Sequence, residues 1–258
     1  MTRSQTEGHH VDAPRQPGLA ILVLLCSMAL LFRAAAWLNP SSLVEIPESL
    51  ALPTSGLGVL YLICALWVWR SRSKLAGVFL LYGIGGCVHW GGTIASDSTA
   101  LGTVFAVFYV AGTAVGDAAF LDMALRYPRS LLRRDLRMRA FYLLAILAFI
   151  AIPIAPFVSS DIVNSGLGVI LLGSLAIAVA GGVVFIVKWF RASSAERREQ
   201  SLTAIVVVLI VTNAVSLLAD GGVLPGESAA WNLMFGLEPL VLAWALTRKS
   251  PTEGMARS

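Results

Sequence analysis

Long apolar stretches, each close to the length of a membrane-crossing helix, constrain this chain more than any other feature. Eight of them follow one another at 18–38, 50–69, 75–95, 101–125, 140–158, 164–187, 202–219 and 230–247. A helix needs about 20 apolar residues to cross roughly 30 Å of hydrocarbon. A membrane β-barrel would need apolar and polar residues in strict alternation, a pattern that these stretches lack. The sequence therefore predicts an all-α, polytopic transmembrane bundle of eight spans.

Composition excludes the soluble classes. The chain is 57% hydrophobic and only 13% charged, whereas a soluble domain is about 45–50% apolar and roughly 25% charged. Its 3 Cys and 23 Gly residues do not suit a disulfide-stapled or a collagen-like protein. We divide the chain into a polar tail at 1–17, a transmembrane domain at 18–247 and a second tail at 248–258.

Basic residues fall in alternate connections, which predicts the orientation of the spans. All 19 Lys and Arg residues except Arg33 lie in the two tails or in the connections 70–74, 126–139 and 188–201. Cytoplasmic loops collect Lys and Arg, so both termini are expected in the cytoplasm and the protein in the inner (plasma) membrane. The net charge of +4 then needs no nucleic-acid partner, because basic loops face anionic lipids. The leucine-interleaved connection 126–139 also suits a short amphipathic segment on the lipid surface.

The first span also resembles a signal peptide, with an apolar stretch before Ala34-Ala35-Ala36. Arg33 interrupts that stretch just before the small residues, and the stretch exceeds the usual length, so we expect the span to be retained. Cleavage would instead leave seven helices and an N-terminus on the outer side.

Ionisable side chains inside a span cost roughly 2.5–3.5 kcal/mol each, so they tend to face the bundle interior. The chain has five of them: Arg33, His89, Asp117, Asp122 and Glu238. Counted from the span ends at 1.5 Å per residue, Arg33, His89 and Glu238 share a depth about 7–12 Å below the outer surface. We expect these three to line an outward-opening ligand pocket, with Glu238 as the counter-ion of Arg33.

Each member of this pocket also has a simpler interpretation. Arg33 could extend to the outer headgroups, and His89 could be a hydrogen-bonded packing residue. Three tryptophans would either wall the pocket or belong to the interfacial aromatic belt: Trp37, Trp90 and Trp231. Glu238 is too short to reach the headgroups, and Pro239 beside it should free the carbonyl of Phe235 and kink the helix.

Small residues in the fourth span predict a close helix contact. Gly112 and Gly116 are four residues apart, a spacing that lets two helices approach. Asp117 should lie at that contact, either bonded to a neighbouring hydroxyl or available for proton transfer. Asp122 is expected to pair with Arg126, four residues further on. These glycines and aspartates would form the packing and relay region.

The sequence shows no signature of an enzyme or a cofactor site. G-x-S-x-G, H-E-x-x-H and Walker motifs are absent. Cys87 and His89 are two residues apart and so point away from each other on a helix, which makes a metal site improbable. No lysine lies near the middle of the last span to hold retinal. If the protein were an enzyme, its acid and base groups would be Asp117, Glu238 and His89.

Three segments carry a resemblance to a family. FLDMALRYPRSLLRRDLRMRAFYLLAIL (120–147), ERREQSLTAIVVVLI (196–210) and LEPLVLAWALTRKS (237–250) resemble, in order, parts of the multi-helix membrane input modules of bacterial sensor histidine kinases. Tyr127 replaces the usual Phe, and Asp122 stands where His is frequent. The coiled-coil and kinase domains that normally follow are missing from this sequence. The resemblance implies a signal-input role that works through a separate cytoplasmic partner or a kinase in trans, or else a different function on the same scaffold.

We therefore expect a sensor or receptor-like membrane protein that binds a small or lipidic ligand. Two rival functions use the same residues. One is an intramembrane enzyme acting on a lipid or isoprenoid substrate by acid–base chemistry, and the other is a small proton-coupled transporter.

Overall fold

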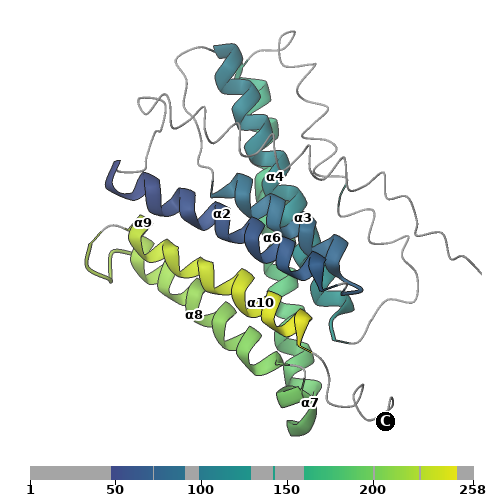
Figure 1. Ribbon diagram of the computed structural model, residues 1–258. Coiled ribbons are helices and arrows are strands. Elements are labelled where there is room, and N and C mark those ends of the chain that lie inside the picture. Colours follow the sequence, from purple (N-terminus) through teal and green to yellow (C-terminus); the bar gives the residue numbers. More distant parts are fainter. Residues whose placement is uncertain are drawn as a thin grey trace, which may run out of the picture.

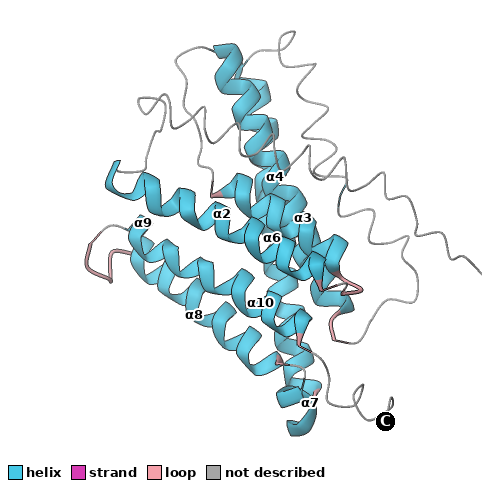
Figure 2. Cartoon of the chain, in the orientation of Figure 1, coloured by secondary structure: helices cyan, strands magenta, loops and turns pink. Residues whose placement is uncertain are grey.

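The computed structural model describes residues 48–71, 73–90, 99–128, 142, 160–199, 201–226 and 228–248. These residues form helices and short connections, with no strand among them (Figure 2). The predicted spans 18–38 and 140–158 lie outside the described residues, apart from Tyr142, as do both tails except Arg248. The number of spans and the side on which the termini lie therefore stay predictions.

Four long helices come first: α2 (Glu48–Arg70), α3 (Ala76–His89), α4 (Thr99–Arg126) and α6 (Ser160–Arg191). They are followed by α7 (Ser194–Glu199), α8 (Leu202–Asp220), α9 (Ser228–Trp231), the 3₁₀ helix η4 (Asn232–Gly236) and α10 (Leu237–Thr247). The bounds of α2, α4, α6 and α8 lie within four residues of the predicted stretches. By contrast, α3 ends at His89, six residues before the predicted end, and α10 begins at Leu237, seven residues after the predicted start. An all-helical fold is confirmed for the described part of the chain.

The six longest described helices pack as a ring. Each contacts the next along the series α2, α3, α4, α6, α8 and α10, and α10 returns to α2. In Figure 1, α8 and α10 lie side by side, with α2 beside them. The main hydrophobic core lies inside this arrangement, and its largest fully buried side chains include Phe79, Met123 and Phe185.

Among the described residues, three helices are long and apolar enough to cross a membrane: Val107–Arg126, Ser165–Arg191 and Leu202–Asp220. Their apolar side chains do not all turn inward. On α6, Val169 is 70% exposed and Leu172 is 69% exposed, and on α8 Leu217 is 73% exposed. Such a surface is stable in lipid but not in water. The structure thus indicates a membrane protein.

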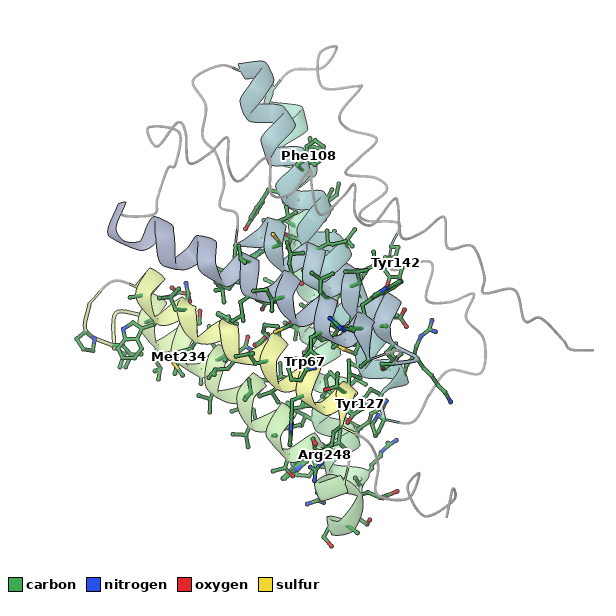
Figure 3. All side chains as sticks on the ribbon, viewed as in Figure 1. Trp67, Phe108, Tyr127, Tyr142, Met234 and Arg248 are labelled. Carbon is green, nitrogen blue, oxygen red and sulfur yellow. The ribbon has the colours of Figure 1, made fainter. Side chains whose placement is uncertain are left out.

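The basic ends of the described helices meet at one end of the bundle. Tyr127, just after α4, donates its hydroxyl proton to the carbonyl of Ala245 near the end of α10, at 3.4 Å. Trp189 near the end of α6 donates its indole N–H to Thr203 in the first turn of α8, at 3.1 Å. Figure 3 shows Tyr127 and Arg248 near each other at this end, with Met234 far from both. We call it the basic end of the bundle.

Candidate functional site

Glu238 is the acidic residue in the first turn of α10, and only 9% of its surface is exposed. Its carboxyl group joins three helices. Oε1 lies 2.7 Å from the hydroxyl of Thr212 on α8, and Oε2 accepts a long hydrogen bond of 3.5 Å from the hydroxyl of Tyr82 on α3. Within the described part of the chain these hydroxyls are the hydrogen-bonding partners of the carboxyl group. The side chain therefore points into the bundle and not toward lipid.

Pro239 explains the backbone around this acid. Proline has no N–H to donate to the carbonyl of Phe235, and its ring crowds that carbonyl. The chain winds as the 3₁₀ helix η4 up to Gly236 and becomes α-helical at Leu237. The hydroxyl of Tyr61 on α2 donates to the carbonyl of Phe235 at 3.4 Å. The freed carbonyl thus bonds to another helix, and the helix changes its winding where the sequence predicts a kink.

Aromatic side chains pack around the ring of Tyr82, whose hydroxyl donates to Glu238. The ring of Tyr82 lies 5.3 Å from that of Tyr61, 5.6 Å from that of Phe79 and 5.9 Å from that of Phe120. Centroid separations of this size are typical of favourable aromatic packing. These rings come from α2, α3 and α4, so the packing holds Tyr82 in place against all three helices.

Asp117 lies on α4 at the contact with α3 and α6. The hydroxyl of Ser174 on α6 donates to its Oδ2 at 2.5 Å. A Cβ atom added to Gly116 would lie 3.0 Å from Cα of Gly85 on α3, so the two backbones touch at this point. The close approach is the one that the Gly112–Gly116 spacing predicts, and a hydroxyl partner is one of the two roles expected for Asp117. Asp117 is also within electrostatic range of Glu238.

His89, the last residue of α3, belongs to a second group of polar and aromatic side chains. Its Nδ1 lies 3.3 Å from the hydroxyl of Thr113 and 3.4 Å from that of Tyr109, both on α4. The imidazole stacks on Tyr109 with a centroid separation of 5.6 Å, and the ring of Trp90 meets it edge-on at 5.1 Å. Trp90 in turn packs on Phe235 at 5.5 Å. We call these residues the outer cluster, after the side on which the predicted topology places them: His89, Trp90, Tyr109, Thr113 and Phe235.

The structure does not bring His89 and Glu238 into contact. Glu238 bonds to Tyr82, which lies seven residues before His89 on α3, a separation of about 10 Å at 1.5 Å per residue. The count from the span ends gave the two residues comparable depths because it treats every helix as straight and ending at one level. Trp231 donates its indole N–H to the carbonyl of Pro225 at 3.0 Å. Arg33 and Trp37 lie outside the described residues, so the Arg33–Glu238 pair and the pocket stay predictions.

Asp122 lies toward the basic end of α4 and is 3% exposed. Arg126 pairs with it across one helical turn, as the sequence spacing predicts. The hydroxyl of Tyr142 donates to the same carboxylate at 3.4 Å. This aspartate thus connects α4 to Tyr142 in the predicted fifth span.

Lys188 on α6 has a role that the sequence did not suggest. Its ammonium group donates three hydrogen bonds to carbonyl oxygens at the end of α4, at 2.6 Å to Ala124, 3.0 Å to Leu125 and 2.7 Å to Tyr127. The last carbonyls of a helix have no partner within the helix. Lys188 supplies those partners from a neighbouring helix, so α4 and α6 are fixed together at the basic end.

Sequence reasoning also missed the hydroxyls that bind the acids. Thr212, Tyr82 and Ser174 look like ordinary residues of an apolar stretch, and they become partners only once the neighbouring helices are known. A signal was present nonetheless, because a buried acid in lipid requires polar neighbours. The described residues contain no group of three His, Cys, Asp or Glu side chains placed to hold a metal ion.

Comparison with known proteins adds no relative, because no protein-family model matches the chain and no curated protein or solved structure matches it. The interpretation of this site therefore depends on its own geometry.

Proposed function

We propose that this chain is a sensor or receptor-like protein of the bacterial inner membrane, with eight spans and both termini in the cytoplasm. It binds a small or lipidic ligand in the outer half and signals through a separate cytoplasmic partner, such as a kinase in trans. Resemblance of segments 120–147, 196–210 and 237–250 to sensor-kinase input modules supports this proposal.

The observation that carries the proposal is the three-helix link made by Glu238. Its carboxyl group bonds to α8 and α3 from α10. The outer cluster lies on one side of this link, with Phe235 only three residues before Glu238. The basic end lies on the other side, where Lys188 fixes α6 to α4. A ligand that shifts the outer cluster would move helices whose far ends meet the cytoplasmic partner.

The test measures whether an outer ligand moves the basic end. The full chain is reconstituted in nanodiscs after replacement of its native cysteines, with spin labels at the exposed positions Lys74 and Arg248. The probes are an anionic phospholipid, an isoprenoid alcohol and a small primary amine. A probe of the right class should change the distance between the labels. Glu238→Gln should abolish that change, because the amide alters the link that couples the helices.

Asp220→Asn is the matched control, because Asp220 is exposed at the far end of α8 and should leave the response intact. An unchanged distance with every probe would contradict the sensor function. Substrate flux into vesicles would then favour the transporter, and turnover of an added isoprenoid lipid would favour the enzyme.

A further inference from the structure

The hydroxyl group of Thr212 lies close to two acceptor oxygens but has only one proton to donate. Its Oγ1 lies 2.7 Å from Oε1 of Glu238 and also 2.9 Å from the carbonyl oxygen of Val208, one turn earlier on α8. Both separations are hydrogen-bond distances. A threonine hydroxyl has one proton, and a carbonyl oxygen can only accept. Two full hydrogen bonds form together when Thr212 donates to Val208 and accepts a proton from the carboxyl group of Glu238. With an ionised Glu238, the single hydroxyl proton is shared between the two acceptors.

The other carboxyl oxygen is consistent with this assignment. Oε2 accepts from the hydroxyl of Tyr82, so the carboxyl group can carry its proton on Oε1 and still accept on Oε2. In the described part of the chain no Lys, Arg or His contacts Glu238. A buried carboxyl group needs a counter-charge or a proton, because an isolated charge in an apolar interior is very costly. The hydrogen bonds of Thr212 fit a Glu238 carboxyl group that carries a proton on Oε1.

A second acid lies close enough to influence the first. Asp117 is on α4, and the contact between Gly116 and Gly85 brings its turn against α3, one turn from Tyr82. Asp117 is within electrostatic range of Tyr61, Tyr82 and Glu238. Its hydrogen-bonding partner among the described residues is the hydroxyl of Ser174. Two acids in one poorly screened interior affect each other's proton binding.

We propose that Glu238 and Asp117 form a coupled pair that takes up and releases a proton inside the bundle. Uptake converts the Glu238 carboxylate to a carboxyl group, which donates to Thr212 while the Thr212 hydroxyl turns to Val208. Release returns the proton to water, and the Thr212 hydroxyl turns back to donate to Oε1. Within the described ranges, the groups that face Glu238 are Thr212 on α8, Tyr82 on α3, Tyr61 on α2 and, at longer range, Asp117 on α4.

This proposal goes beyond a sensor function, because proton binding can be measured without a ligand or a partner. The full chain in nanodiscs is titrated with pH while infrared spectroscopy follows the C=O band of protonated carboxyl groups, in H₂O and D₂O. The wild-type protein should show a band that loses intensity as pH rises and shifts to lower frequency in D₂O. Glu238→Gln should remove the component of this band that belongs to Glu238, while the other carboxyl groups keep theirs. Asp117→Asn should keep the Glu238 component and move its midpoint to lower pH by about one unit, because a neighbouring negative charge is lost.

Two variants at Thr212 test the hydrogen bond itself. Thr212→Val removes the acceptor and should raise the C=O frequency, whereas Thr212→Ser keeps the hydroxyl and should leave the frequency near the wild-type value. Asp220→Asn is the control for exposed acids and should change nothing. If Glu238→Gln fails to fold, Glu238→Asp and the wild-type D₂O shift still test the assignment.

Three results would overturn the proposal. They are a wild-type carboxyl band that does not respond to Thr212→Val, a titration of the carboxyl band that is identical in Glu238→Gln and the wild-type protein, and a midpoint that is the same in Asp117→Asn and the wild-type protein. The first two reject proton binding at Glu238, and the third rejects its coupling to Asp117. None of them depends on the distance measurement that tests the sensor function.

Discussion

Lys188 shows how one side chain can complete a helix that lies elsewhere in the sequence. Its ammonium group has three N–H donors, and all three reach carbonyl oxygens at the end of α4. The sequence interpretation treated this lysine only as a positive charge that orients the spans. That interpretation is compatible with the structure, because a cation at a helix C-terminus also interacts favourably with the helix dipole.

Replacement of Lys188 by methionine should destabilise the protein, because three carbonyl oxygens would lose their donor in a partly buried place. Hydrogen bonds to charged groups contribute about 1.5–3 kcal/mol each, with strong non-additivity, so we expect a loss of about 3 kcal/mol in the free energy of unfolding. Thermal unfolding in nanodiscs measures the effect. Lys74→Met is the matched control, because Lys74 is exposed and should change stability by less than about 0.5 kcal/mol. Equal stability of the two variants would show that the three hydrogen bonds contribute little.

Some residue contacts could be predicted from the sequence because both partners lie on one helix. The Asp122–Arg126 pair follows from a spacing of four residues. The free carbonyl of Phe235 follows from Pro239 in the same way. The partners of Glu238 could not be predicted, because Thr212 and Tyr82 lie 26 and 156 residues away from it. Spacing within one helix says nothing about which helices are neighbours.

The contact between α3 and α4 depends on glycines that leave room for the backbones. A Cβ atom at Gly85 would collide with the backbone of Gly116, and one at Gly112 would collide with Val88. Removing the side chains lets the helices approach closely, which increases van der Waals contact where lipid gives no hydrophobic driving force between helices. The spacing of small residues predicted this contact but not its partner helix.

Gly85→Ala should therefore destabilise the protein by about 1–3 kcal/mol, the usual cost of overpacking. Gly77 lies on the same helix, and a Cβ atom there meets no atom within 4 Å. Gly77→Ala should leave stability unchanged or raise it by about 0.5–1 kcal/mol, since alanine favours a helix over glycine. Unfolding of both variants in nanodiscs makes the comparison. Equal effects at the two positions would refute the close contact.

Helix ends could be predicted where the sequence carries a local stop signal. The stretch 202–219 becomes α8, which ends at Asp220 and is followed by Gly222 with a φ of +71°. The short helix α7 was not predicted, although Ser193 and Glu196 cap it reciprocally. Six residues carry too little periodicity to distinguish such a helix from a polar connection.

At the scale of the whole molecule, the alternating charges predict that the basic end faces the cytoplasm. A membrane-impermeant maleimide should therefore label Lys74→Cys and Arg248→Cys only from the cytoplasmic side, in a background without native cysteines. Val223→Cys, at a position 68% exposed after α8, should be labelled only from the other side. Right-side-out and inverted vesicles make the comparison. Labelling of all three from one side would contradict the predicted topology.

The cyclic order of the helices was beyond sequence analysis. Each apolar stretch is compatible with many neighbours, because lipid-facing and protein-facing positions are similarly apolar. The described helices are also apolar nearly all round, so periodicity does not reveal their buried faces. Contacts of Glu238, Asp117 and Lys188 with other helices define the arrangement, and these become visible only in three dimensions.

The return of α10 to α2 has a consequence for how the protein is made. The hydroxyl of Tyr61 and the carbonyl of Phe235 are 174 residues apart, and they meet only after the last helix has left the ribosome. Until then a nascent chain lacks the acid that joins Tyr82 on α3 to Thr212 on α8. A chain truncated before 237 would keep both hydroxyls without this shared partner.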